Sequence, residues 1–356
     1  MTNARTGAGL ASTATRAILR RLPLAATLIG LGLAVWLVAT NDTTAIGAAF
    51  ARIGPLGLAA IVLVRMVILL LCGLGWACLL DRIAAVPQAA FVILRFVREG
   101  INTLLPVASV GGDIVGGRLL TFWGAAGTFA AASILVDLLI QSGALVAFAV
   151  VGVVLLHQVP GEEATLLAQW ASNALMAMTI VLAAFFAFQR AGALRRLTNL
   201  VGDLGRRFTR DGGGADTETK PGAPAQAGDV QDALDRVWAA GRRRPLLWST
   251  VLHVAAWFLG AVEIWIALVC LGVEGAGLAD AIVIEALTQA IKAMAFPVPS
   301  GLGIQEGGFV LVGGLFGLDA GTALALSLVK RVPDVVLGLP ALMVWQSLEA
   351  RRGTVI

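Results

Sequence analysis

The chain has no tyrosine, only three cysteines and only two histidines. Cys72, Cys78 and Cys270 lie inside apolar runs and form no CxxC motif, so disulfides are not expected and the thiols are predicted to pack as small residues. His157 and His253 are too few for a zinc cluster, and we expect no metal and no other cofactor. GxSxG, HExxH and P-loop motifs are also missing, so nothing in the sequence favours an enzyme or a nucleic-acid partner.

Charged residues are scarce as well. They make up 13% of the chain, against about 25% in a typical soluble domain, whereas hydrophobic residues make up 58%. This composition excludes an ordinary soluble protein and indicates an all-α polytopic membrane protein. Because tyrosine is absent, the nine tryptophans must supply most of any aromatic belt at the membrane surface.

Six apolar runs are long enough to cross a bilayer, which takes roughly 20 residues. The predicted spans are 22–40, 55–80, 127–157, 164–189, 246–272 and 320–348. Arginines precede the first span (Arg5, Arg16, Arg20 and Arg21), and 81–98, with Arg95 and Arg98, and 190–245 are basic loops. By the positive-inside rule these segments are cytoplasmic, which predicts a multi-pass membrane protein with both termini in the cytoplasm. A cleaved signal peptide is the alternative for the first run.

Two further apolar stretches, 86–120 and 281–317, are broken by proline and glycine at matching places in the two halves of the chain. Their arms of about 17 residues reach near 25 Å as helices, less than the roughly 30 Å of a hydrocarbon core. We therefore predict an inverted repeat with two re-entrant helical hairpins and about six full spans. Two full spans in each stretch are the alternative.

The predicted organisation has five parts. They are a cytoplasmic segment 1–21, a first membrane half 22–189, a cytoplasmic loop 190–245, a second membrane half 246–350 and a cytoplasmic tail 351–356. In the loop, 190–210 has apolar residues at helical spacing opposite arginines and is suited to contact with an anionic leaflet. Residues 211–228 are typical of a disordered linker, and 229–244 is predicted to be helical again. An ordinary positive-inside loop is the alternative to lipid contact.

The two breaks supply the candidate substrate site. The first contributes Asn102, Pro106, Ser109, Gly111, Gly112 and Asp113, and the second contributes Pro299, Ser300, Gly301, Gly303 and Glu306. Each is a loop that opens a helix, and helix N-termini bind phosphate or carboxylate groups. The acids are either helix caps or protonatable switches, and the glycines serve either close packing or ligand approach. Arg118, Lys330 and Arg331 are candidates to neutralise the acids or to hold a phosphate, and Asp334 follows one helical turn later.

Charges elsewhere in the apolar runs also need partners. Arg65 and Glu263 lie at equal depth in their spans, which predicts an ion pair between the two halves. Ser133, Asp137 and Gln141 share one helix face, and Glu285, Gln289 and Lys292 share another.

The motif Asn102–Pro106 with Gly111–Asp113 and Arg118–Leu120 resembles the first motif of the lysylphosphatidylglycerol synthase transmembrane-region family. Pro299–Gly308 resembles the second motif and Leu328–Asp334 resembles the last-span motif, with the detail closest to the hopanoid-biosynthesis-associated HpnL-type branch. The resemblance implies a membrane domain that moves a lipid across the bilayer. The family often has glycine and arginine at the positions of Ser300 and Gln305, which leaves room for a less charged substrate such as a hopanoid or polyprenyl-linked lipid.

Lipid lysylation is not expected. The bifunctional synthases of the family carry a large soluble aminoacyl-transfer domain in addition to the membrane domain, and this sequence is too short to include one. The first hypothesis is a lipid translocator for an anionic phospholipid or a hopanoid- or polyprenyl-type lipid. The second is a non-transporting scaffold for lipid-biosynthesis proteins, and the third is an embedded prenyl-lipid transferase.

Overall fold

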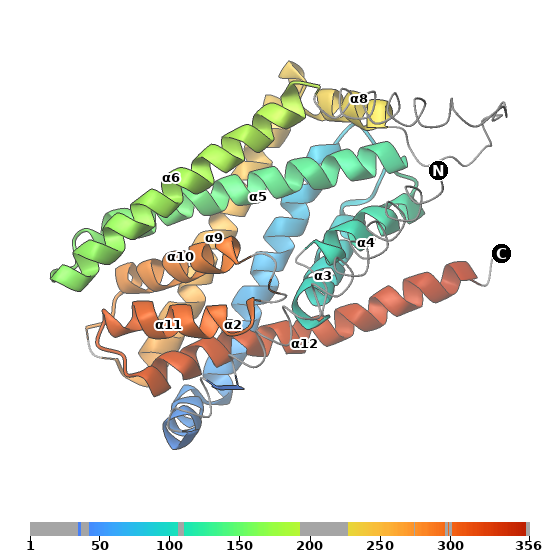
Figure 1. Cartoon of the computed structure of the whole chain (residues 1–356). Coiled ribbons are helices and arrows are strands. Elements are labelled where there is room, and N and C mark those ends of the chain that lie inside the picture. The colour runs from blue at the N-terminus through green and yellow to red at the C-terminus, as the bar shows by residue number, and fades with distance from the viewer. Residues whose placement is uncertain are drawn as a thin grey trace, which may run out of the picture.

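The computed structural model describes residues 35–36, 43–105, 110–192, 227–273, 275–295, 298 and 301–353. In these ranges every regular element is helical, with ten α-helices and two short 3₁₀ turns. The helices are α2 (Thr43–Leu80), α3 (Gln88–Leu104), α4 (Gly111–Leu120), α5 (Gly127–Leu156), α6 (Glu162–Arg190), α8 (Ala227–Val237), α9 (Arg243–Leu271), α10 (Leu278–Met294), α11 (Ile304–Gly314) and α12 (Ala320–Gly353) (Figure 1). The all-α prediction is confirmed for the described residues.

Four of these helices are long and apolar enough to cross a membrane. They are Ile46–Leu80 of α2, Gly127–Leu156, Glu162–Arg190 and Ala240–Leu271. They match four of the six predicted spans, whereas 22–40 falls largely outside the described residues. The sixth, 320–348, forms α12, which has the length but carries Lys330, Arg331 and Asp334. The predicted start at residue 55 coincides with a kink in α2, where Gly54 has φ 62° and is followed by Pro55.

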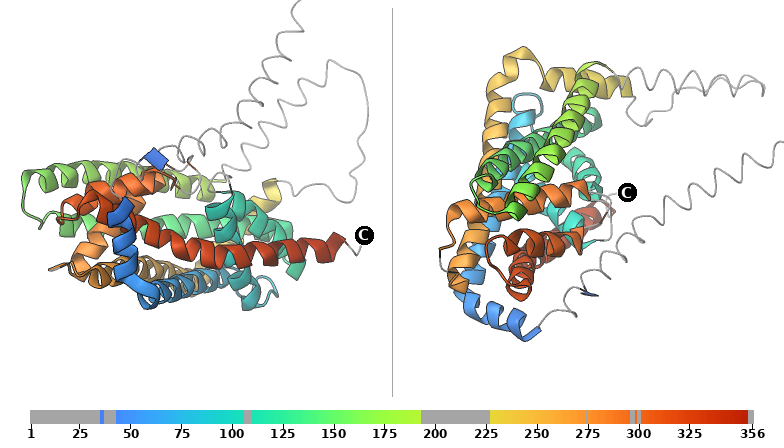
Figure 2. Two further views of the ribbon diagram at one scale, coloured as in Figure 1. Left: turned by 90° about the horizontal axis from the view of Figure 1, so that it is seen from below. Right: turned by 60° about the vertical axis from the view of Figure 1, so that its left-hand side comes forward.

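The long helices α2 and α9 pack along each other on one face of the bundle (Figures 1 and 2). α3 packs on α2, α4 and α12. α10 packs on α9, α11 and α5. The helix pairs α3–α4 and α10–α11 are therefore each held between one of these two helices and a long helix from the other half of the chain.

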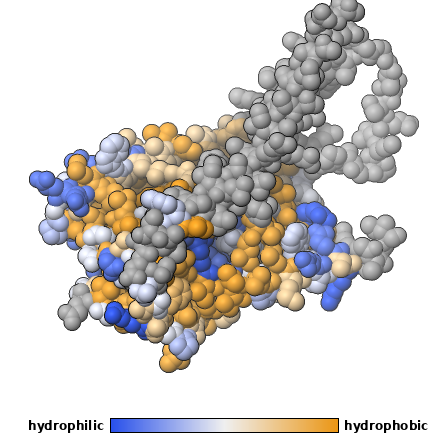
Figure 3. All heavy atoms as spheres, turned by 60° about the horizontal axis from the view of Figure 1, so that its bottom comes forward, coloured by the Kyte–Doolittle hydropathy of each residue, from blue (hydrophilic) through white to orange (hydrophobic). Residues whose placement is uncertain are grey.

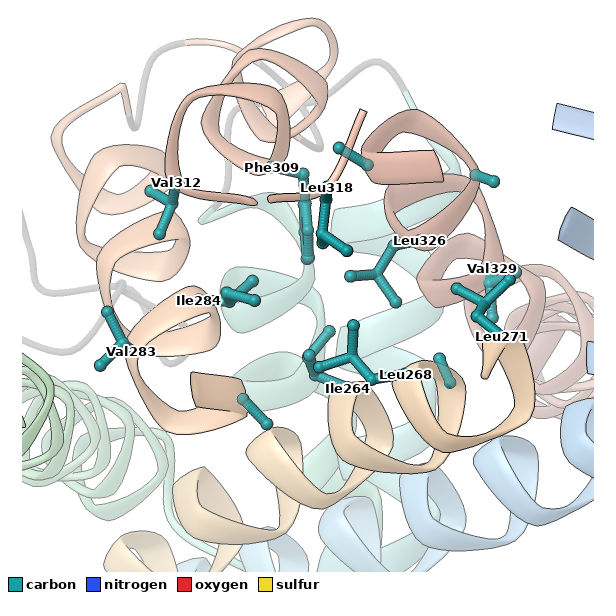
Figure 4. Packing of buried hydrophobic residues seen from close by; sticks show 14 of the residues in the cluster. Ile264, Leu268, Leu271, Val283, Ile284, Phe309, Val312, Leu318, Leu326 and Val329 are labelled. Carbon is teal, nitrogen blue, oxygen red and sulfur yellow. The ribbon is translucent and has the colours of Figure 1, made fainter. Parts of the chain in front are cut away.

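Each helix pair has its own apolar cluster. One cluster joins α2 to α3, α4, α5 and α8, and the other joins α2, α5, α6 and α9 to α10, α11 and α12. Figure 4 shows part of the second cluster, with Ile264, Leu268, Leu271, Val283, Ile284, Phe309, Val312, Leu318, Leu326 and Val329. Lipid is as apolar as leucine, so between membrane helices such contacts contribute through close packing rather than through removal from water.

Close packing is helped by glycine at two helix crossings. A Cβ on Gly152 of α5 would meet the Cβ of Ala286 of α10 at 2.5 Å. A Cβ on Gly100 of α3 would meet the carbonyl oxygen of Gly338 of α12 at 3.0 Å. The backbones of α3 and α12 therefore lie in direct contact, as small residues allow in membrane proteins.

The outer surface is largely apolar, and hydrophilic residues gather at its ends and in a patch between the apolar flanks (Figure 3). α6 contributes many exposed apolar side chains, among them Trp170, Met176 and Ile180. Exposed apolar area of this extent excludes water as the surrounding solvent and fits a lipid environment.

The structure corrects one reading of the loops. Arg95 and Arg98 were expected in a solvated cytoplasmic loop, but both are buried on α3, whose helix begins at Gln88. The predicted helix at 229–244 is present as α8, although it ends at Val237 and α9 begins at Arg243. α8 packs Ala233, Leu234 and Val237 into the first apolar cluster. Three predicted segments of the chain lie outside the described residues. They are 1–21, nearly all of 190–210 and nearly all of 211–228.

Candidate functional site

The first acidic group of the site is Asp113, the third residue of α4. Arg98 of α3 binds it through Nε, 2.8 Å from Oδ1, and through Nη2. The same guanidinium donates through Nη1 to Oδ2 of Asp137 on α5, at 2.8 Å. Its Cζ lies 4.6 Å from the ring centre of Trp76 on α2, a cation–π contact. One buried arginine therefore ties two carboxylates and four helices together.

Asn102 connects the end of α3 to the start of α4. Its Oδ1 accepts a hydrogen bond from the backbone N–H of Gly112 at 2.7 Å, and its Nδ2 lies 3.5 Å from Oδ2 of Asp113. A Cβ at Gly112 would overlap the carbonyl oxygen of Arg98, so only glycine fits there. The structure thus brings Asn102, Gly111, Gly112 and Asp113 together as predicted, whereas Pro106 and Ser109 lie outside the described residues.

The polar face predicted on α5 points at α2 and α3. Ser133 accepts a hydrogen bond from Trp76, at 3.1 Å, and Gln141 accepts one from Arg95, at 3.0 Å. Asp137 also faces His253 of α9, whose Nε2 lies 3.4 Å from Oδ1. Both side chains are buried, so this carboxylate is shared between an arginine and an imidazole.

Glu306, the third residue of α11, is the second acidic group. Its Oε2 accepts a hydrogen bond from the backbone N–H of Gly303 at 2.7 Å, and this bond caps the start of α11. Its Oε1 accepts a hydrogen bond from Nε of Arg331 on α12 at 2.7 Å. The side chain is therefore both a cap and a member of an ion pair. Gly303 has φ 75° and Gly301 has φ 59°, which explains glycine at both positions. Pro299 and Ser300 lie outside the described residues.

Gln305 joins α11 to two further helices. Its Nε2 lies 3.3 Å from Oγ of Ser327 on α12, and its Oε1 accepts a hydrogen bond from Nζ of Lys292 on α10 at 3.2 Å.

A third charged cluster connects the two halves of the chain. Arg65 of α2 donates from Nε and Nη2 to Glu263 of α9, at 2.9 and 2.7 Å, so the structure contains the ion pair predicted from equal depth. Lys330 of α12 contacts Glu285 of α10 and lies 3.5 Å from Oε2 of Glu263. Asp334 lies 4.0 Å from Nη1 of Arg65.

Arg118 is not part of these clusters. Its side chain is 62% exposed at the end of α4, where Nη2 binds Glu349 of α12 at 2.8 Å. The cation that neutralises Asp113 is Arg98 instead. Arg98 and His253 are among the site residues that the sequence reasoning missed.

The clusters leave little free space in this conformation. The cavity beside Arg65, Glu99 and Asp334 measures about 10 Å³, which holds at most one water. Within the described ranges, no three histidine, cysteine or acidic side chains gather as a metal site would require.

The family described as Lysylphosphatidylglycerol synthase TM region matches residues 24–340, a range that includes both broken apolar stretches and the buried ion pairs. The chain belongs to this family. No curated protein and no solved structure matches it. As a member of the lysylphosphatidylglycerol synthase TM region family with four long apolar helices, it is a multi-pass membrane protein. The match includes both helix pairs and every candidate site residue, while the HpnL-type resemblance stays a prediction.

Proposed function

We propose that the protein is a lipid translocator of the bacterial inner membrane, with both termini in the cytoplasm. The observation that carries the proposal is the pair of acids at the third residue of two short helices. Asp113 and Glu306 are both buried inside an apolar bundle, and each is bound by an arginine. Ionisable groups inside a membrane are costly and commonly mark a substrate or ion pathway.

The lengths of α4 and α11 support re-entrant helix pairs. With 10 and 11 residues, they rise about 15 and 17 Å. A hydrocarbon core is about 30 Å thick, so neither helix is long enough to cross it. Each pair therefore enters the membrane, turns inside it and returns.

The packing pattern supports an inverted repeat. If α2, α3, α4 and α5 are exchanged for α9, α10, α11 and α12, each contact maps onto another contact. The packing of α3 on α12 becomes that of α10 on α5, and the packing of α4 on α5 becomes that of α11 on α12. The contact of α2 with α9 maps onto itself, so the axis of the proposed repeat would run between these two helices.

Transport would proceed by exchange of partners in the ion pairs. A lipid phosphate that reaches Arg331 takes the place of Glu306, which keeps its hydrogen bond from Gly303 and is not left without a partner. Lys292 supplies a further cation next to Gln305, where the family often has arginine. These cations favour an anionic phospholipid, with a phosphate-linked hopanoid or polyprenyl lipid as the second class.

The test is movement of a headgroup-labelled phosphatidylglycerol across vesicles that contain the purified protein. We expect wild type to expose the inner-leaflet label to a membrane-impermeant quencher much faster than empty vesicles do. Glu306→Gln and Asn102→Ala are expected to slow this at least tenfold. Arg118→Gln is the matched control at an exposed ion pair and should stay within twofold of wild type. The proposal fails if wild type equals empty vesicles, or if both site variants fold and keep the wild-type rate.

A further inference from the structure

A second polar site lies away from the ion pairs, where the end of α2 meets the start of α9 and the start of α3. It is a cavity of about 650 Å³. Arg82, Arg242 and Arg244 contribute its cations, and Phe91 and Trp248 contribute aromatic walls. Asp81 is the one carboxylate among the lining residues, so the lining carries a net charge of +2, from three arginines and one aspartate.

Arg242 fixes the floor of this cavity. Its Nη1 donates to the carbonyl oxygen of Asp81 at 2.6 Å, and its Nη2 donates to those of Leu79 at 2.9 Å and Cys78 at 3.2 Å. These carbonyls follow or belong to the last turn of α2, where helical partners run out, so the guanidinium caps the helix end and offsets its negative dipole. Its Nε is buried with no hydrogen-bond partner among the described residues, which leaves one donor unused at the site.

Arg82 and Arg244 stand at the opening. Arg82 has φ 58°, the only positive φ at a non-glycine residue in the described part of the chain. A left-handed backbone is unfavourable for a residue with a side chain, and glycine would avoid that cost. The side chain is 91% exposed, with Nε 3.8 Å from Oδ2 of Asp81. Arg244 is exposed, and no carboxylate of the described residues pairs with it.

Neighbouring side chains place the opening at headgroup depth. Leu247 and Trp248, which follow Arg244 on α9, are 63% and 52% exposed. Exposed tryptophan beside exposed leucine at the end of a span is typical of the membrane–water interface. A charged opening with an apolar wall at this depth matches a lipid, with the phosphate at the arginines and the glycerol and upper acyl carbons against the exposed Trp248.

We propose that this cavity binds the phosphate of an anionic glycerophospholipid from the surrounding leaflet. The proposal rests on the protein's position in a membrane but not on lipid translocation. It can therefore be tested independently of the proposed function. Arginine pairs with phosphate through parallel N–H donors, and two of the three guanidinium groups at this site are exposed to receive one.

The test is native mass spectrometry of the purified protein released from nanodiscs of equal phosphatidylglycerol and phosphatidylcholine. Wild type is expected to retain phosphatidylglycerol selectively, and Arg82→Gln combined with Arg244→Gln should reduce that retention about tenfold, since each basic residue near an anionic surface contributes severalfold. Arg243→Gln is the control matched to the Arg244→Gln change, because it removes one charge from the same helix end but does not line the cavity. It should stay within twofold of wild type.

Three results would overturn the proposal. The first is equal phosphatidylglycerol retention in wild type and the double variant, and the second is an equal loss in the Arg243 variant, which would indicate general charge attraction. The third is complete displacement of the lipid by inorganic phosphate at millimolar concentration, which would identify a free anion as the ligand. The two substituted side chains are exposed and outside the apolar clusters, so the variants are expected to fold, and translocation rates of the same samples report on the other site.

Discussion

Removing Arg65 is expected to destabilise the protein more than removing the charge of Glu263. The cluster contains two cations, Arg65 and Lys330, and three carboxylates, Glu263, Glu285 and Asp334, which gives a net charge of −1. Arg65→Ala changes the net charge to −2, whereas Glu263→Gln changes it to 0. In a low-dielectric interior an uncompensated charge is the costly state.

The magnitudes follow from the partners that remain. Without Arg65, the fully buried Glu263 keeps only Lys330, which also contacts Glu285, so we expect the roughly 3–5 kcal/mol of a broken buried pair. With Glu263→Gln, Arg65 keeps Asp334 and Lys330 keeps Glu285, so we expect about 1–2 kcal/mol, close to the value of one charged hydrogen bond.

The measurement is unfolding in mixed micelles, followed by tryptophan fluorescence, for Arg65→Ala, Glu263→Gln, Glu263→Ala and the Arg65→Ala/Glu263→Ala pair. The double variant should be at least about 1 kcal/mol more stable than the sum of its single variants predicts. Additive effects, or Glu263→Gln at least as damaging as Arg65→Ala, would refute this account of the cluster.

Three further predictions address single positions. Gly112→Ala should abolish the folded protein in size-exclusion chromatography, because its Cβ overlaps the backbone of α3, whereas Gly127→Ala, with open space around it, should behave as wild type. Asp319→Ala should lower the free energy of unfolding by about 1 kcal/mol, since Asp319 caps α12 through Thr322. Those hydrogen bonds hold the pKa of Asp319 below its ordinary value, so this contribution is present near neutral pH and is lost as the pH falls through the lowered pKa, a trend that denaturation at several pH values checks. Arg118→Ala should change stability by less than about 0.5 kcal/mol in the same assay, because its ion pair is exposed.

Four of the six span positions, the two breaks and the Arg65–Glu263 pair could be predicted from the sequence. Apolar run length sets where a helix can lie in a membrane, and depth along two such runs decides which buried charges can meet. The kink of α2 was marked by Pro55 and its neighbouring glycine. These features depend on local composition, which a single sequence contains.

The partner of Asp113 depends on tertiary packing, so the sequence offers Arg118 only as a candidate, whereas the structure pairs Asp113 with Arg98. Arg118 is near Asp113 in sequence, but five residues turn an α-helix by about 500°, which leaves the two side chains roughly 140° apart. That geometry alone disfavours the pair. Arg98 was treated as a loop residue because arginines near the ends of spans are counted as solvated, although it is the eleventh residue of α3. The contact of His253 with Asp137 on another helix has no local signal.

The separation of Arg65 from Glu263 has a consequence during biosynthesis. The two residues lie 198 positions apart, so at about 5–20 residues per second the ribosome needs roughly 10–40 s to supply the glutamate after the arginine. In that interval α2 enters the bilayer with an arginine that costs about 3 kcal/mol at a helix centre and no partner from α9. About six leucine, isoleucine or valine residues offset that cost, and α2 has eleven between Leu56 and Leu71. Arg98, by contrast, has its partner Asp113 only 15 residues later in the chain. The buried charge of Arg98 can therefore be neutralised before the second half of the protein is synthesised.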